Sequence, residues 1–508
     1  MTLTLLVFIP LLGAAIQAFF PRENADLHRK WGLAVSLIGL VIVLGMWGPF
    51  DSGLAGVQFE EQAAWIPSVG ASYHLGIDGI SYPMLLITAI VSVLAVLASW
   101  NISHRQKEFF AWMLVLQTAV YGVFVALDYL LFFFFWELML IPMYFLIGIW
   151  GGPRREYAAI KFLIYTLVGS AVMVVGILAT YFKAGLGTFD IIRIAEEANL
   201  DPNFQFWAFL AFFIGFAVKV PVWPFHTWLP DAHVEAPTGG SMILAGILLK
   251  TGAYGFFRIV FPTFPAGADA FKWLLALLAV ISIIYGALAA MAQRDLKRMV
   301  AYSSVSHMGF VMLGLAAAAG TVAGARGLVD SGSVAHLVAS GSLALSGALF
   351  VMVSHGLISP LLFFLVGSVF YDRTHTRMMD EMGGYYTKIP VAATILAFAA
   401  FANLGLPGLS GFVGEFFTLV GSFPAFRVDV IIAAVGLVIT AAYHLWMLHR
   451  VLMGEGKPDE RYPDINGREL AVGIPLVALI AVLGIYPSLV TSLFNPAVGH
   501  LMTKLGGI

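Results

Sequence analysis

Residues 204–254 read FQFWAFLAFFIGFAVKVPVWPFHTWLPDAHVEAPTGGSMILAGILLKTGAY, two apolar segments that each contain one lysine. Lys219 ends a run that has no other charge back to Asp201, and Lys250 lies ten residues into a run that opens at Gly240. A charge at such a depth in a membrane costs at least a few kcal/mol. We therefore predict membrane-spanning helices with functional lysines. The alternative for Lys219 is that its side chain reaches up to the membrane interface.

Two prolines follow Lys219 closely, at positions 221 and 224. A proline has no backbone N–H and clashes with the carbonyl four residues earlier. The carbonyls of Ala217 and Val220 are therefore predicted to lose their helical partners. A helix that is broken beside an ionisable group is typical of ion-binding sites in transporters. Further along, His226, Asp231 and His233 either gate this segment or only cap it, and their spacing does not indicate metal ligands.

The composition of the whole chain supports a membrane protein with many spans. Of its 508 residues 60% are hydrophobic and 11% are charged, whereas soluble domains carry about 25% charged residues. The net charge of −2 gives no reason to expect binding to nucleic acid. There is no cysteine, which excludes Cys-ligated zinc or iron–sulfur clusters, and no nucleotide-binding glycine motif is present. We expect no cofactor and no metal in this chain.

A spanning helix needs about 20 apolar residues, and this length criterion predicts an all-α integral membrane protein with about fourteen transmembrane helices. The seventh and twelfth are interrupted, which suggests two inverted five-helix repeats. The predicted division is an N-terminal three-helix segment (1–108), a first repeat (109–265), a second repeat (266–455) and one C-terminal helix (456–508). Three connections are long: 51–79, which is acidic, 182–203, with a short interfacial helix, and 320–341, which we expect to be a flexible loop.

The distribution of basic residues predicts the orientation. Eighteen of the 27 Lys and Arg residues lie in loops that follow odd-numbered spans, and seven lie in the other loops and ends. Loops rich in Lys and Arg stay in the cytoplasm. The sequence therefore predicts that both termini face outward.

Four more ionisable residues lie inside apolar segments: Glu137, His307, His355 and Glu415. A lone carboxyl such as that of Glu137 stays protonated in lipid unless a cation is near. Glu415 follows a segment that Pro407 and regularly spaced glycines weaken as a helix. Intramembrane acids and histidines usually line ion paths, so we interpret these residues with Lys219 and Lys250 as a proton path. The alternative is that buried pairs only lock helices together.

At these residues the sequence resembles a known family. The segments WELMLIPMYFLIGIWGG, KFLIYTLVGS, RDLKRMVAYSSVSHMGF and GLPGLSGFVGEF, together with the stretch around Lys219 and Lys250, are similar to the antiporter-like subunits of respiratory complex I, the bacterial NADH:quinone oxidoreductase. The resemblance covers about residues 75–455. Glu415 stands where sister subunits are expected to carry lysine, and the long lateral helix of the largest sister is absent.

The resemblance implies roles for the buried residues. Glu137 and Lys219 form the charged pair of the input half, and Lys250 links that half to the centre. His307 and His355 continue the axis, and Glu415 is the terminal station. It also implies that NADH, flavin, iron–sulfur clusters and quinone are bound by partner subunits. The expected partners are sister membrane-arm subunits on both sides, lipids and protons, and the expected location is the bacterial inner membrane.

Two other functions remain open from the sequence. A multisubunit cation/proton antiporter shares the fold and the lysines, and it predicts sodium transport without NADH oxidation. A structural membrane anchor of a related redox complex predicts that removal of Lys219 leaves pumping unchanged.

Overall fold

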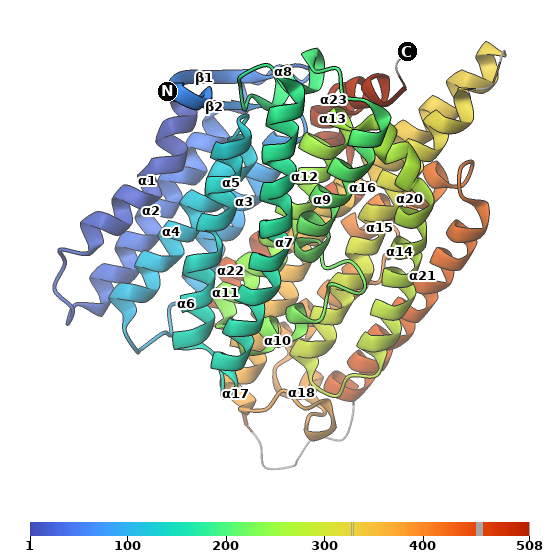
Figure 1. The fold of residues 1–508 in the computed structure, drawn as a ribbon. Helices are drawn as coiled ribbons and strands as arrows, with labels where there is room; N and C mark the ends of the chain where they lie inside the picture. The colour runs from blue at the N-terminus through green and yellow to red at the C-terminus, as the bar shows by residue number, and fades with distance from the viewer. Residues whose placement is uncertain (327, 329, 454–460, 507–508) are drawn as a thin grey trace.

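The computed structural model describes residues 1–326, 328, 330–453 and 461–506. In this part of the chain the helices stand side by side as one bundle, with short elements covering its two ends (Figure 1). Eleven of the described helices are long and apolar enough to cross a membrane. The prediction of a helical membrane protein is confirmed at this level.

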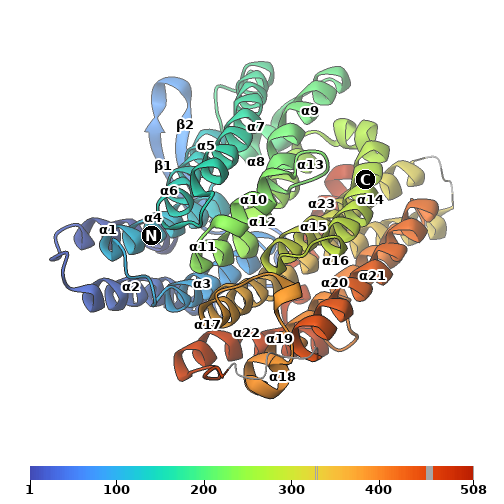
Figure 2. The ribbon, with the colours of Figure 1, turned by 90° about the horizontal axis from the view of Figure 1, so that it is seen from below.

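The N-terminal segment departs from the all-α prediction. Residues 51–79 were expected to be a long acidic loop, but they contain a two-stranded antiparallel hairpin in which Gln58 pairs with Ile77. Gly70 makes the turn possible because its φ of 72° is left-handed. The hairpin projects past the edge of the helix bundle (Figure 2). The elements are α1 (Thr2–Gln17), α2 (Ala25–Gly45), β1 (Gln58–Ile66), η1 (Pro67–Val69), β2 (Ala71–Ile77) and α3 (Ser81–Ala98).

The next group contains the first broken helix. As expected, the connection 182–203 contains a short helix, α8. The span that includes Lys250 contains two π-helical turns, η2 and η3. The elements are α4 (Gln106–Val125), α5 (Tyr129–Leu138), α6 (Leu140–Trp150), α7 (Arg155–Ala184), α8 (Ile191–Glu197), α9 (Pro202–Lys219), α10 (Trp228–Glu235), α11 (Thr238–Ile243), η2 (Leu244–Leu248), α12 (Leu249–Gly255), η3 (Phe256–Val260) and α13 (Phe261–Thr263).

The second group contains the second broken helix and packs beside the first (Figure 2). Its elements are α14 (Pro265–Met291), α15 (Leu296–Ala325), α16 (Ser331–Phe364), η4 (Leu365–Phe370), α17 (Tyr371–Thr374), η5 (Met379–Glu381), α18 (Tyr385–Lys388), α19 (Pro390–Asn403), α20 (Ser410–Ser422), α21 (Arg427–Leu448) and η6 (His449–Met453).

Both interruptions lie where the prolines predicted them. Helix α9 ends at Lys219 and α10 begins at Trp228, and α19 ends at Asn403 before α20 begins at Ser410. One detail of the prediction is wrong, because the carbonyl of Ala217 is not left free. It accepts a hydrogen bond from the backbone N–H of Val222 at 2.9 Å.

The prediction of a flexible loop over 320–341 is also wrong. Helix α15 continues to Ala325 and α16 begins at Ser331, with residues 327 and 329 outside the described part of the chain. The glycines of this stretch favour a loop by propensity, but close helix packing outweighs it: Gly320 lies against Phe426 and Gly341 against Thr321. Asp330 caps the second helix by accepting a hydrogen bond from the Ser333 N–H at 2.8 Å.

The C-terminal segment holds two helices, not the single helix that was predicted. Helix α22 (Gly467–Ile485) begins at a capping box of Asn466 and Glu469, and α23 (Ser488–Gly506) follows. Pro487 separates them because a proline disfavours helical backbone in the residue before it. The boundary expected at 455/456 and the loop residue Lys457 lie outside the described residues.

The start of α1 and the end of α23 lie at the same end of the bundle, together with the hairpin (Figure 1). We call this the upper end, as drawn in that figure. The opposite, lower end carries α17 and α18.

Candidate proton-conducting site

Four predicted residues form a continuous buried chain in the middle of the bundle. The Nζ of Lys250 lies 2.6 Å from Nδ1 of His355. The rings of His355 and His307 lie 5.7 Å apart between centroids, and Nδ1 of His307 lies 2.7 Å from Oε1 of Glu415. All four residues are at most 5% exposed. The contacts give the order Lys250, His355, His307, Glu415, so His355 comes before His307.

The backbone around Lys250 explains how its ammonium group is held. Lys250 follows the π-helical turn η2, and its Nζ also donates to the carbonyl of Ala245 at 2.6 Å. A π-helical turn shifts the register of the backbone hydrogen bonds and is frequent at functional sites. Lys250 therefore has a fixed position with one donor directed at a histidine.

A small cavity lies between the residues at the far end of this chain. Its volume is about 10 Å³, and His307, Ser354, His355, Asn403 and Glu415 contribute to its lining. This is close to the space that one water molecule needs. The Nε2 atoms of both histidines have no hydrogen-bond partner in the described structure. A water here would join the two histidines to the carboxyl of Glu415.

Lys219 is buried among aromatic rings. Its Nζ lies 5.2 Å from the ring centroid of Trp136 and 5.7 Å from that of Phe162, and it has no hydrogen-bond partner among the described residues. The side chain is 1% exposed, so it does not reach a membrane interface within the chain. Helix α12 approaches closely here because Gly252 has no side chain: a Cβ there would lie 2.8 Å from Cβ of Lys219.

Glu137 lies near Lys219 but does not bind it directly. The Glu137 side chain is only partly buried, whereas Val218 and Val220, which flank Lys219, are buried. Its Oε1 has no hydrogen-bond partner in the described structure. The two charges act on each other through space. The implied charged pair is therefore a pair in electrostatic range and not an ion pair in contact.

The three polar residues after the first break have different roles. Asp231 is the centre of a basic cluster, with Lys161 at 2.7 Å, Arg298 at 3.4 Å and Arg154 at 3.6 Å. His233 and His226, by contrast, are buried and have no hydrogen-bond partner at either ring nitrogen in the described structure.

The sequence reasoning missed Lys297, which is 4% exposed and donates to the carbonyl of Ala236 at 2.6 Å. It lies at the wall of a polar cavity of about 330 Å³ at the lower end, together with Glu235, Asp372 and Arg377. Lys297 was missed because the charged segment RDLKR, residues 294–298, is typical of a solvated loop. Its burial follows from α15 packing against α10.

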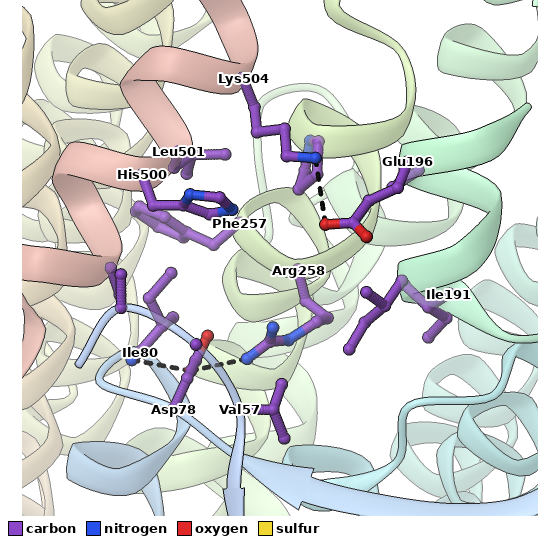
Figure 3. A pocket seen from close by; sticks show the side chains of 16 residues that line it. Val57, Asp78, Ile80, Ile191, Glu196, Phe257, Arg258, His500, Leu501 and Lys504 are labelled. Carbon is purple, nitrogen blue, oxygen red and sulfur yellow. Dashed lines mark hydrogen bonds and ion pairs between the residues drawn. The ribbon is translucent and has the colours of Figure 1, made fainter. Parts of the chain in front are cut away.

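The upper end carries two further charged arrangements that the sequence did not reveal. A cavity of about 150 Å³ lies where the hairpin connection, α8 and α23 meet (Figure 3). At its edges Arg258 pairs with Asp78 at 2.6 Å, and Lys504 pairs with Glu196 at 3.2 Å. Figure 3 shows both pairs facing this cavity. They tie together segments that are far apart in the sequence.

The second arrangement is centred on His74 of strand β2. Its Nδ1 lies 2.6 Å from Oδ2 of Asp190 and its Nε2 lies 2.8 Å from Oε1 of Glu60. Burial alone lowers the pKa of His74, but the hydrogen bonds and charges of the two carboxylates outweigh burial and raise the pKa above 6.5. Burial raises the pKa of Asp190, but its hydrogen bonds with His74 and with the Arg193 backbone N–H together outweigh burial and lower the pKa below 3.8. The hairpin is thus joined to the N-cap residue of α8 by the hydrogen bond between His74 and Asp190.

Sequence comparisons extend over almost the whole chain. The family described as "NADH:quinone oxidoreductase/Mrp antiporter, TM" matches residues 126–329 and 332–440, and "NADH-ubiquinone oxidoreductase chain 4, amino terminus" matches residues 60–122. NADH-quinone oxidoreductase subunit M of Rhodobacter capsulatus is 43% identical, over 98% of this chain and 96% of that protein. NADH-ubiquinone oxidoreductase chain 4 of Arabidopsis thaliana is 39% identical, over 98% and 96%.

Solved structures are also similar to this chain over almost its whole length. A chain of respiratory complex I from Thermus thermophilus superimposes with a TM-score of 0.87 at 30% identity, and all of both chains is covered. A chain of the Mrp complex from Dietzia superimposes with a TM-score of 0.84 at 20% identity, covering 99% of both, and this shows a shared fold alone.

Proposed function

The chain belongs to the family of membrane subunits of NADH:quinone oxidoreductase and Mrp antiporters, and from that membership we propose that it is the M subunit of a respiratory NADH:quinone oxidoreductase, where it translocates protons. The observation that carries this proposal is the chain of buried contacts from Lys250 through His355 and His307 to Glu415, placed between two broken helices. Each member can gain or lose a proton, and each lies within reach of the next directly or through one water.

Lys219 and Glu137 form the input half of this path. Lys219 has no hydrogen-bond acceptor among the described residues and lies against aromatic faces, so its charge is stabilised mainly by cation–π attraction and by the carboxylate of Glu137. When Glu137 changes its protonation or its distance, the ammonium loses part of this stabilisation. Lys219 then releases its proton toward Lys250, on the helix packed against it.

The chain performs no redox chemistry itself. It has no cysteine, and NADH, flavin, iron–sulfur clusters and quinone are assigned to partner subunits. Sister membrane-arm subunits flank it on both sides, and lipids cover the rest. The apolar side chains exposed along α7 and α21, such as Val168, Val175, Val428 and Val438, suit such contacts.

The number of spans, the internal repeats and the orientation of the termini belong to the same proposal. All fourteen segments cross the bacterial inner membrane, residues 109–265 and 266–455 are inverted repeats, and both termini face outward. The polar cavity beside Lys297 then opens on the cytoplasmic side, where protons enter.

The decisive experiment removes the ammonium of Lys219. Lys219→Ala is expected to lower proton uptake by membrane vesicles to less than about a tenth of wild type, normalised to assembled complex. Lys183→Ala is the matched control, because Lys183 is 45% exposed and pairs with Asp201 on the surface. Normal pumping by an assembled Lys219→Ala complex would exclude this path and favour a structural anchor.

The antiporter alternative is tested in the same vesicles. If the chain is the M subunit, proton uptake starts when NADH is added and stops when electron transfer to quinone is inhibited. Sodium movement that persists without NADH would identify an antiporter instead.

A further inference from the structure

Another buried histidine, His444 of α21, lies directly beside the end of the broken helix α19. Its Nδ1 is 3.0 Å from the carbonyl of Thr440, and its Nε2 is 3.1 Å from Nδ2 of Asn403. Because a carbonyl only accepts, Nδ1 must carry the hydrogen of the neutral ring. The Nε2 lone pair therefore accepts a hydrogen bond from the Asn403 amide. His444 is fully buried and Asn403 is 3% exposed.

Asn403 links this histidine to the proton path. The same side chain lines the cavity of about 10 Å³ that His307, His355 and Glu415 also line. Its Nδ2 also approaches the hydroxyl of Ser303, one helical turn before His307, at 3.4 Å. In the described structure the side chain of Asn403 therefore contacts both the cavity and the basic nitrogen of His444.

The position of His444 in the chain matches that of Lys250. Lys250 follows Lys219 by 31 residues, and His444 follows Glu415 by 29. Each lies on the span that follows a broken helix, Thr238–Thr263 for Lys250 and Arg427–Met453 for His444. If the two halves are repeats, a titratable residue is expected at this place in the second half as in the first.

We propose that His444 is a further proton-carrying residue that exchanges a proton with Glu415, and that the side chain of Asn403 controls this exchange. When the Asn403 amide turns away from Nε2, the lone pair faces the cavity. A proton then moves from the Glu415 carboxyl through the cavity water to Nε2. The products are the Glu415 carboxylate and a His444 imidazolium whose Nδ1–H donates to the Thr440 carbonyl. The Asn403 amide then turns back with its oxygen toward Nε2 and accepts the second N–H.

The inference rests on the proposed function, because it extends the same path beyond Glu415. The competing explanation is that the hydrogen bond between Asn403 and His444 only holds α21 against α19. A structural bond of this kind predicts a loss of stability or assembly and no specific loss of proton transfer.

The test compares His444→Gln with His449→Gln in the intact complex. Glutamine at 444 offers an amide oxygen to Asn403 but does not take up a proton. His449 is exposed and lies five residues further along the same helical segment, so its replacement is the same chemical change outside the path. His444→Gln is expected to slow NADH-driven proton uptake about tenfold, with native gels and thermal stability unchanged, whereas His449→Gln pumps normally.

A double variant tests the role of Asn403. If Asn403 and His444 act in one step, Asn403→Leu slows pumping by itself, and the double variant Asn403→Leu/His444→Gln is no slower than the worse single variant. Additive losses, or losses that follow thermal stability, would overturn the proposal in favour of the structural bond. Normal pumping by assembled His444→Gln would overturn it as well. Glu415→Gln is measured alongside to distinguish a failure of this inference from a failure of the proposed function. If Glu415→Gln pumps normally, the proposed path itself fails at Glu415.

Discussion

The ammonium nitrogen of Lys250 lies 2.6 Å from Nδ1 of His355, although 105 residues separate the two in the sequence. A charged lysine donates to this nitrogen, so the imidazole must present a lone pair there and carry its hydrogen on Nε2. Transfer of one proton across this contact converts an ammonium and a neutral imidazole into an amine and an imidazolium. The contact thus joins the two halves of the molecule by a single proton-transfer step.

Replacements of Lys250 should show whether its proton or its charge is needed. Lys250→Arg keeps a positive charge and donors but does not release a proton at physiological pH. Lys250→Met keeps the length and removes both. We expect both variants to lose about nine-tenths or more of proton uptake in assembled complexes. Wild-type pumping by the arginine variant would mean that Lys250 is only a fixed charge.

Glu137 should tolerate a shorter acid but not an amide. Because its carboxyl acts on Lys219 through space and not through direct contact, Glu137→Asp moves the charge slightly and keeps most of its effect. Glu137→Gln removes the charge and should reduce pumping severalfold more than Glu137→Asp. The measurement is proton uptake per electron transferred. Equal, wild-type rates for both variants would leave only a structural role.

Glu415 should need a titratable group more than a negative one. Glu415→Gln keeps a hydrogen bond to His307 but carries no proton, so pumping should fall about tenfold while the complex stays assembled on native gels. Glu415→Lys should retain more activity than Glu415→Gln, since an amine also takes up and releases a proton. A complex that dissociates in the glutamine variant would point to an assembly role instead.

The orientation can be tested with reporters at the two ends of the bundle. The upper end carries both termini, and the connection between α3 and α4 lies at the lower end. A reporter that fluoresces only in the cytoplasm should be dark when fused at Ile508 and bright when inserted near Asn101. The reverse pattern would overturn the topology and place the Lys297 cavity outside.

The contact between the hairpin and α8 should weaken at alkaline pH. Since the pKa of His74 is raised in the folded protein, its stabilisation is complete below its ordinary pKa of 6.5 and is lost as the pH rises through the raised value. Asp190 has a lowered pKa, so its contribution is lost only at acid pH, below 3.8. Hydrogen exchange in residues 58–77, corrected for intrinsic rates, should accelerate as the pH rises above 6.5.

His74→Gln provides the control for this effect. Its hairpin should exchange faster at the lower pH and should show little further change as the pH rises. If the variant keeps the same pH dependence as wild type, His74 is not the group responsible.

The sequence by itself determined the class of the fold and supplied the candidate residues of the proposed path. Apolar runs of about 20 residues identify spans because lipid leaves every backbone polar group to be satisfied within the helix. Pro221, Pro224 and Pro407 located both breaks, because a proline withdraws a hydrogen bond wherever the helix is formed. Buried ionisable residues stand out for the same local reason, since each is a costly exception in an apolar run.

Only the tertiary structure decided which of these residues meet. Nothing local to Lys250 or His355 indicates their contact, and the order of His355 before His307 reverses the order along the chain. The hairpin at 58–77 was missed because β1 is largely exposed and shows no alternation of buried and exposed residues. Lys297 obtains the carbonyl of Ala236, and His444 the amide of Asn403, from other segments of the chain. The sequence shows which polar groups are unfavourable to bury, whereas the packing of distant helices determines which partner group compensates for that burial.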